Sequence, residues 1–417
     1  MELVKGVNVH FIPTTKYKTN RIKIRFSAPM SEETVAGRVL TASMLETANQ
    51  VYPTSQAFRE RLAILYGADF STTVSRRGMV HYLDLDITFV RDLFLSRKNK
   101  LMGQIFDFLR AALFHPLREE DAFEQATFEI EKKNLILDLE AEKENHFYHA
   151  HIELDKLFYE KEQMQIPRIA RLDLVERETA KTSFTVFQKM LTENAIDMFF
   201  LGDFNERDIL ERLSVFDFQE RDVNLPLQYQ QEFSTIVREG FEKRETHQSI
   251  LELAYHFPIQ YGEVGHLPLV LVNGLLGGFA HSKLFVNVRE KEGLAYTISS
   301  QFDIFSGFMR LYAGIDRKNR TRAFSLMNRQ LADIKRGRFT ERDLLETKAM
   351  VRNTNLLSQD RQSSLIEQSY MTSIFGSKCL SLERWLTDLD KVSKEEVMAA
   401  AQDLKLQAVY FMEGKYE

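Results

Sequence analysis

Two stretches of the chain, roughly 200 residues apart, share a pattern in which a capped helix leads into an apolar strand. The first is DLVERETAKTSF (173–184), followed by AIDMFFLGDF (195–204). The second is DKVSKEEVMAA (390–400), followed by AVYFMEGK (408–415). A repeat of this length indicates two copies of one structural unit rather than two unrelated domains. The chain has 417 residues, which is long enough for both copies.

Short apolar or alternating segments between helical stretches predict strands in both copies. They are RIKIRFSA (21–28), HYLDLDITF (81–89), SILELAYHFPI (249–259) and a hairpin over 299–316. Residues 119–160 contain no Gly or Pro and predict either one long helix or two helices broken near Asn145. We therefore expect an α+β fold, in which each half is a mostly antiparallel sheet covered by helices and the two halves form half of a clamshell.

A polar segment, residues 221–247, separates the two copies and predicts a linker. The expected domains are residues 1–220 and 248–417. Ligand sites often form in the cleft between two such domains, and an extended ligand would suit this cleft.

Composition excludes several classes of function. The net charge is −5 with no block of Lys or Arg, so neither nucleic acid nor a membrane surface is an expected partner. The longest apolar run, 267–280, is too short to cross a bilayer. Cys379, the single cysteine, cannot form an internal disulfide, and the N-terminal residues lack an apolar signal core, so we expect a cytoplasmic protein.

The most specific motif is GGFAHSKLFVNVREKEGLAYTISS (277–300). It resembles the C-terminal-half signature of the insulinase/pitrilysin metallopeptidases, in particular the small two-subunit type that includes mitochondrial processing peptidase. The resemblance covers essentially the whole chain. It implies that Arg289 and Tyr296 reach the peptide backbone near the scissile bond of a substrate. Spacing alone also permits Arg289 to pair with a neighbouring Glu and Tyr296 to be an ordinary half-buried strand residue.

Active members of that family carry H-x-x-E-H, in which two His on one helical face bind Zn²⁺ and the Glu acts on the bound water. The corresponding helix here is expected within residues 37–54. One register places the three motif positions at Val39, Ala42 and Ser43. The other register aligns Glu46 with the motif Glu and puts Ser43 and Thr47 at the His positions. Neither register supplies a histidine.

The third zinc ligand of the family is a Glu on a later helix, which EKKNLILD (131–138) resembles. Glu131 and Asp138 lie seven residues apart, on one helical face, and the resemblance puts Asp138 at the ligand position. One carboxylate without imidazoles cannot make a four-coordinate zinc site. We therefore expect no metal or other cofactor in this chain and no zinc-dependent hydrolysis by it alone.

A second candidate metal site falls within AEKENHFYHAHIELDK (141–156). Glu142, His146, His149 and Glu153 share one face if the helix is continuous, and His151 is nearby. The alternative is a solvated, charge-rich helical face. This second interpretation predicts no bound metal.

The resemblance implies a non-catalytic subunit that binds unfolded peptides and supplies Arg289 and Tyr296 to a homologous, zinc-bearing partner. An alternative is a peptide-binding or assembly protein without proteolytic activity, which could form a homodimer. A third is a hydrolase that uses the His-rich helix as a displaced metal site.

Overall fold

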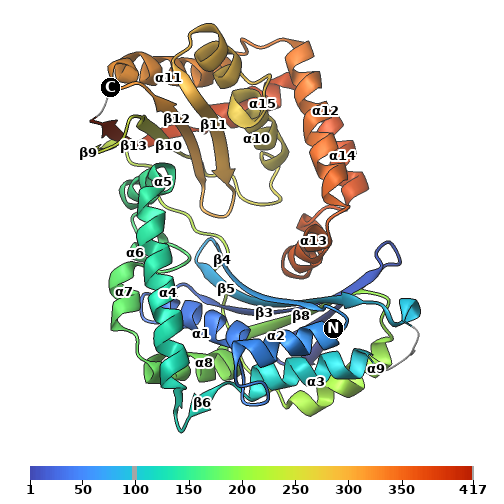
Figure 1. The fold of residues 1–417 in the computed structure, drawn as a ribbon. Coiled ribbons are helices and arrows are strands. Elements are labelled where there is room, and N and C mark those ends of the chain that lie inside the picture. The colour runs from blue at the N-terminus through green and yellow to red at the C-terminus, as the bar shows by residue number, and fades with distance from the viewer. Residues whose placement is uncertain (96–100, 416–417) are drawn as a thin grey trace. The chain divides into compact units, whose positions relative to one another are not determined.

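The computed structural model describes residues 1–95 and 101–415, which form two compact units (Figure 1). Unit 1 comprises Met1–Ala141, Ile166–Leu227 and Leu365–Tyr370. Unit 2 comprises Glu142–Gln165, Gln228–Ser364 and Met371–Glu417. Each unit therefore includes one segment from the other half of the sequence. No helix in the described part of the chain combines the length and apolar character needed to cross a membrane.

A six-stranded mixed sheet with the order β1-β2-β8-β3-β5-β4 forms the centre of unit 1. Its strands are β1 (Glu2–Val4), β2 (Val7–Pro13), β3 (Thr19–Pro29), β4 (Asp69–Arg77), β5 (Val80–Val90) and β8 (Ala195–Gly202). The helices of this part of the chain are α1 (Val35–Thr47), α2 (Ser55–Ile64), α3 (Leu101–Phe114), α4 (Gln125–Glu144), α7 (Leu172–Arg177), α8 (Ala180–Glu193) and α9 (Glu206–Leu213). Strands β2 and β8 are parallel, and the other neighbouring strands are antiparallel.

Unit 2 contains a five-stranded sheet with the order β11-β12-β10-β13-β9. Its strands are β9 (Arg238–Arg244), β10 (Ser249–His256), β11 (Ala295–Asp303), β12 (Phe308–Ile315) and β13 (Lys405–Gly414). Its helices are α5 (His146–Phe158), α6 (Glu162–Gln165), α10 (His266–Asn273), α11 (Arg320–Lys335), α12 (Glu341–Ser358), α13 (Gln362–Phe375), α14 (Leu382–Lys391) and α15 (Lys394–Gln402), with π-helical turns at Gly274–Gly278 and Leu284–Lys291. The middle of α13, Leu365–Tyr370, belongs to unit 1.

The two sheets have the same topology. In unit 2 the parallel pair is β9 and β13, and β10, β12 and β11 follow as antiparallel neighbours. These five strands correspond in order and direction to β2, β8, β3, β5 and β4 of unit 1. Strand β9 lies inside the segment 221–247 that the sequence suggests is a linker. The α+β class with two mixed, helix-covered sheets is confirmed, and the shared topology supports the predicted duplication.

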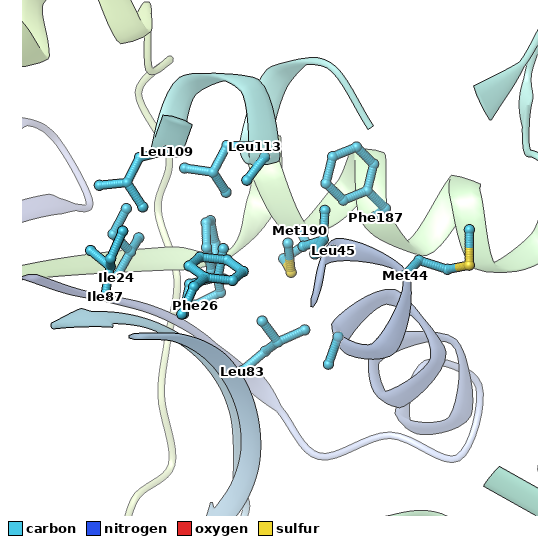
Figure 2. Packing of buried hydrophobic residues seen from close by; sticks show 14 of the residues in the cluster. Ile24, Phe26, Met44, Leu45, Leu83, Ile87, Leu109, Leu113, Phe187 and Met190 are labelled. Atoms are coloured by element: carbon cyan, nitrogen blue, oxygen red, sulfur yellow. The ribbon is translucent and has the colours of Figure 1, made fainter. Parts of the chain in front are cut away.

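The core of unit 1 lies between its sheet and the helices that cover one face of it. Ile24 and Phe26 of β3 and Leu83 and Ile87 of β5 point into this core, because alternate residues of a strand face opposite sides of the sheet. Figure 2 shows them beside side chains from α1, α3 and α8, among them Leu109. The other face of β3 and β5 carries charged residues instead.

Residues 119–160, which the sequence predicts to be one or two helices, begin with a hairpin and contain one break between helices. A two-stranded hairpin, β6 (Arg118–Glu119) and β7 (Ala122–Phe123), precedes α4 and turns through Glu120, whose φ is 49°. The break is at Asn145, whose side chain accepts a hydrogen bond from the Tyr148 N–H and thereby caps α5. The alternative with two helices is therefore correct, and α4 begins at Gln125 rather than near Glu119.

Candidate functional site

A pocket of about 770 Å³ lies in unit 1 among α1, α2, β4 and α4. Its polar lining consists mostly of hydroxyl groups, from Ser43, Thr47, Thr54, Ser55, Thr72, Thr73 and Thr127. The other polar side chains are two carboxylates, Glu46 and Glu131, and the exposed guanidinium of Arg59. Val39 and Ala42 add to an apolar wall. The pocket therefore includes every position that either register assigns to the H-x-x-E-H motif.

Helix α1 brings these positions to one face because they recur at helical spacing. Thr47 Oγ1 lies 2.9 Å from Glu131 Oε1, which joins α1 to α4. Glu46 Oε2 accepts hydrogen bonds from the Thr72 N–H at 2.8 Å and the Thr72 hydroxyl at 2.9 Å, which joins α1 to β4. Ser43 is held by the main chain of its own helix, 3.4 Å from Val39 O. Glu131 thus bonds to Thr47, which stands at a His position of the second register, while Glu46 bonds to Thr72 outside the motif.

The structure separates the two acids of α4. Glu131 lines the pocket, whereas Asp138 is exposed and is not among the lining residues. Seven helical residues span about 10 Å along the helix axis, so only one of the two acids reaches α1. Glu131 is therefore the acid that faces the degenerate motif.

The donor set of this pocket does not fit zinc. A zinc site takes four ligands from Cys, His, Asp or Glu, and neutral hydroxyls of Ser and Thr are not among its usual donors. Across residues 1–95 and 101–415, no three or more His, Cys, Asp or Glu side chains are grouped so that they could hold a metal. We derive no metal chemistry from this pocket.

The His-rich segment is split between two helices. Glu142 lies on α4, before the break, and His146 and His149 lie on α5. His149 Nε2 is 2.7 Å from Glu242 Oε2 on β9, and His151 Nδ1 is 3.7 Å from Asp155 Oδ1. His149 thus takes part in packing α5 onto the sheet of unit 2.

Arg289 and Tyr296 lie in unit 2, on either side of the turn that ends the π-helical segment. Arg289 is 3.6 Å from Glu290 and its guanidinium lies 4.7 Å from the centre of the Phe285 ring. Gly293, with φ of +60°, redirects the chain into β11, where Tyr296 is 66% exposed. The Tyr296 hydroxyl lies 3.4 Å from Asp316 Oδ1. Both side chains keep accessible polar ends, and Tyr296 is more exposed than an ordinary half-buried strand residue.

Comparison with known proteins places this geometry in a family. Residues 179–351 match the family model described as the peptidase M16 inactive domain. The chain is 26% identical over 410 residues to the probable inactive metalloprotease YmfF of Bacillus subtilis (strain 168), covering 98% of this chain and 96% of that protein. The chain belongs to the M16 peptidase family. M16 is the insulinase/pitrilysin family, so the resemblance seen in the sequence is confirmed, and the chain is similar to proteins of that family described as inactive.

Two further proteins are similar to this chain. A conserved protein from Enterococcus faecalis V583 has a crystal structure with a TM-score of 0.97 to this chain and 37% identity, covering 100% of this chain and 98% of that one. The uncharacterized zinc protease YmxG of Bacillus subtilis (strain 168) is 29% identical over 167 residues, which is 39% of this chain and 40% of that protein. The chain is thus similar both to a protein named as a probable inactive metalloprotease and to a protein named as a zinc protease.

The geometry of the pocket predicts how histidines introduced at the motif positions would change its affinity for zinc. The double variant Ser43→His/Thr47→His is expected to bind Zn²⁺ at least about 100-fold more tightly than the unmodified chain, measured by isothermal titration calorimetry. Two His four residues apart would face the pocket, and loss of the Thr47 hydroxyl would free Glu131 to act as the third ligand.

The matched control is Val39→His/Ser43→His, which has the same spacing in the other register. Val39 lies two helical turns from Thr47, the residue that bonds to Glu131, so this pair should gain less zinc affinity. Equal affinity of the two double variants, or no gain in either, would contradict the alignment of Glu46 with the motif Glu.

The sequence could identify some site residues and not others. The absence of histidine from the motif positions is visible in the sequence alone. The bond between Glu46 and Thr72 had no local signal, because Thr72 lies on a strand 26 residues away. Thr73 and Thr127 likewise reach the pocket only through tertiary packing.

Proposed function

We propose that this chain is the non-catalytic subunit of a heterodimeric zinc endopeptidase. It binds unfolded peptides and supplies Arg289 and Tyr296 to a homologous partner that carries zinc. The observation that supports the proposal is the pocket in unit 1, where Glu46 and Glu131 lie beside Ser43 and Thr47, the hydroxyl residues that one register puts at the His positions. We also propose a cytoplasmic location, because the single cysteine cannot form an internal disulfide.

Peptide binding is supported by the strand that borders the pocket. Strand β4 is at the edge of its sheet, and Thr72, Thr73 and Val74 from it line the pocket. An unfolded peptide can add to such an edge through main-chain hydrogen bonds, while neighbouring pockets accept alternate side chains. A folded protein could not present an extended segment in this way.

The chemistry of Arg289 and Tyr296 suits a carbonyl oxygen that gains charge. A guanidinium stays protonated at all working pH values, and a phenol can donate a hydrogen bond at pH 7. Donors aimed at a developing oxyanion are worth about 10²–10³ in rate in other enzymes. Arg289 contacts only its sequence neighbour Glu290 among the described ion pairs, so its guanidinium can turn to a substrate at little cost.

The test is hydrolysis of an unfolded fluorogenic peptide by the chain alone, by an H-x-x-E-H homologue alone, and by the mixture. We expect activity to rise only in the mixture, with zinc bound to the homologue. Arg289→Ala should then lower the rate of the mixture by about ten- to a thousandfold.

Arg338→Ala serves as the control, since Arg338 is exposed in the same unit and pairs with Asp333 at 3.2 Å. Its rate should match that of the unmodified mixture. Hydrolysis by this chain alone would overturn the proposal, and a full rate with Arg289→Ala would remove Arg289 from the mechanism. Peptide binding without any effect on the partner would favour a stand-alone peptide-binding or assembly protein.

A further inference from the structure

A second pocket, of about 500 Å³, lies entirely within unit 2. It is bounded by the loop between β10 and α10, the loop before α14, and α14 itself. Its aromatic lining is Tyr261, His266 and Trp385. The Tyr261 and His266 rings lie 5.1 Å apart, and the other neighbours of Tyr261 include Phe305, stacked at 5.6 Å. The Tyr261 ring is therefore fixed before any ligand arrives.

His266 contributes a ring rather than a charge. Burial lowers the pKa of His266 to about 4, so its imidazole is neutral at pH 7. Its Nδ1 accepts a hydrogen bond from the Gly262 N–H at 3.4 Å, which fixes the ring against the loop. Tyr261, His266 and half-buried Trp385 thus offer flat, uncharged surfaces suited to a planar ring.

The acids around this pocket are committed to other contacts. Glu263 Oε2 accepts the Gln260 N–H at 2.8 Å, in its own turn. Glu396 Oε2 accepts the Ser393 N–H at 2.7 Å, at the start of α15, where the helix dipole offsets its charge. Asp388 is the one remaining acid of the lining.

The pocket has more cationic side chains than acids that remain available, since only Asp388 stands against several cations. Asp388 lies 3.0 Å from Lys391 and 3.7 Å from Arg384, so one carboxylate serves two cations. Lys378 is exposed and takes part in none of the ion pairs of the described residues. The pocket therefore offers positive charge beside aromatic rings.

We propose that this pocket binds a small planar aromatic anion. The ring of the ligand would pack against Tyr261 and Trp385, and its carboxylate or phosphate would be held by Lys378 and Arg384. Neither the ring nor the anionic group alone would make both sets of contacts. The site is separate from the pocket of unit 1, and it does not depend on the proposed peptidase role.

Trp385 is the only tryptophan of the chain, so its fluorescence reports directly on this pocket. The test titrates the full chain with benzoate, phenyl phosphate, benzamide and inorganic phosphate. We expect saturable changes with benzoate or phenyl phosphate, at least about fivefold tighter than with benzamide or inorganic phosphate. The tighter of the two anionic probes identifies the ligand as a carboxylate or a phosphate. Affinity for benzamide equal to that for the tighter anionic probe, or no saturation by any probe, would overturn the proposal.

Lys378→Gln should weaken binding of the tighter anionic probe by about five- to tenfold and leave benzamide unchanged. Lys318→Gln is the matched control, because Lys318 is an exposed lysine of the same unit outside the pocket. Both lysines are on the surface, so neither change should disturb folding. Equal effects of the two substitutions would show general charge attraction and would also overturn the proposal.

Discussion

Replacing Arg25 with alanine is expected to lower the free energy of unfolding of unit 1 by about 3–5 kcal/mol. Arg25 lies on β3, is 3% exposed, and donates two hydrogen bonds of 2.8 Å to Asp84 on β5. It also donates to both carboxylate oxygens of Glu367, at 2.5 and 3.2 Å. Removing Arg25 takes four hydrogen bonds from two carboxylates in a largely buried setting, and Lys23 at 2.8 Å from Asp84 and Arg77 at 3.1 Å from Glu367 replace only part of that charge.

The surroundings of Arg25 show how strongly it is coupled to its neighbours. Its guanidinium lies 4.7 Å from the centre of the Tyr82 ring and 4.6 Å from that of Tyr370, so truncation also removes packing. Burial alone would raise the pKa of Asp84, but the charge and hydrogen bonds of Arg25 and then Lys23 outweigh it and lower that pKa to about 2. A carboxyl group whose pKa is lowered in the folded state stabilises the fold at every pH above the ordinary pKa of that group. This contribution of Asp84 is therefore fully present at pH 7.

Urea unfolding followed by circular dichroism at pH 7 would measure the effect. Arg21→Ala is the matched control, because Arg21 lies on the same face of β3 but its side chain is 19% exposed. Arg21 donates a single hydrogen bond, to Asp86 at 2.6 Å, whereas Arg25 donates four, so we expect a loss of only about 1 kcal/mol. A loss below 1 kcal/mol for Arg25→Ala, or equal losses for both variants, would contradict the account of a buried, shared cation.

The sequence was sufficient where local pattern decides the structure. Strands β3 and β5 could be placed because alternation gives them one apolar and one charged face. The break at Asn145 could be placed because Asn is a good helix cap. The β6–β7 hairpin could not, since its turn has no Gly or Pro and uses Glu120 in a left-handed conformation.

Contacts between residues far apart in the chain could not be predicted from the sequence. Arg25 and Glu367 are 342 residues apart, and no local signal joins β3 to the middle of α13. Choosing between Glu131 and Asp138 required the packing of α4 against α1, because both acids share one helical face. The roles of Arg289 and Tyr296 stay predictions, because they concern a peptide and a partner chain.

A second large effect is expected from Glu252→Gln, which should stabilise unit 2 at alkaline pH. Glu252 lies on β10 with 0% exposure, and neither of its carboxylate oxygens has a hydrogen-bond partner among the described residues. Arg310 Nη1 on β12 lies 3.6 Å away, and α5, which packs on β10, brings the charge of Asp155 close to Glu252; His151 lies 3.7 Å from Asp155. Burial is the largest cause that raises the pKa of Glu252, to about 8; Asp155 adds to it and Arg310 opposes it.

The sign of the pH dependence follows from this raised pKa. Below pH 4.5 the carboxyl is protonated in the folded and unfolded states alike, so it has no effect on stability. Between pH 4.5 and about 8 only the unfolded state ionises, so stability falls as pH rises. One pKa unit corresponds to about 1.4 kcal/mol, so the penalty above pH 8 is of the order of 4–5 kcal/mol.

Glutamine cannot ionise, so the stability of Glu252→Gln should match that of the unmodified chain near pH 5 and exceed it by about 2–4 kcal/mol at pH 8.5. The gain is smaller than the full penalty because the buried amide also lacks hydrogen-bond partners. Urea unfolding followed by Trp385 fluorescence reports on unit 2, which contains this residue.

Glu242→Gln is the control, and its effect on stability should have the opposite sign. Burial would raise the pKa of Glu242, but hydrogen bonds from Tyr410 and His149 lower it, so this change should cost up to about 1 kcal/mol at pH 7. A Glu252→Gln chain with the same pH profile as the unmodified chain would show that Glu252 ionises freely in the folded state.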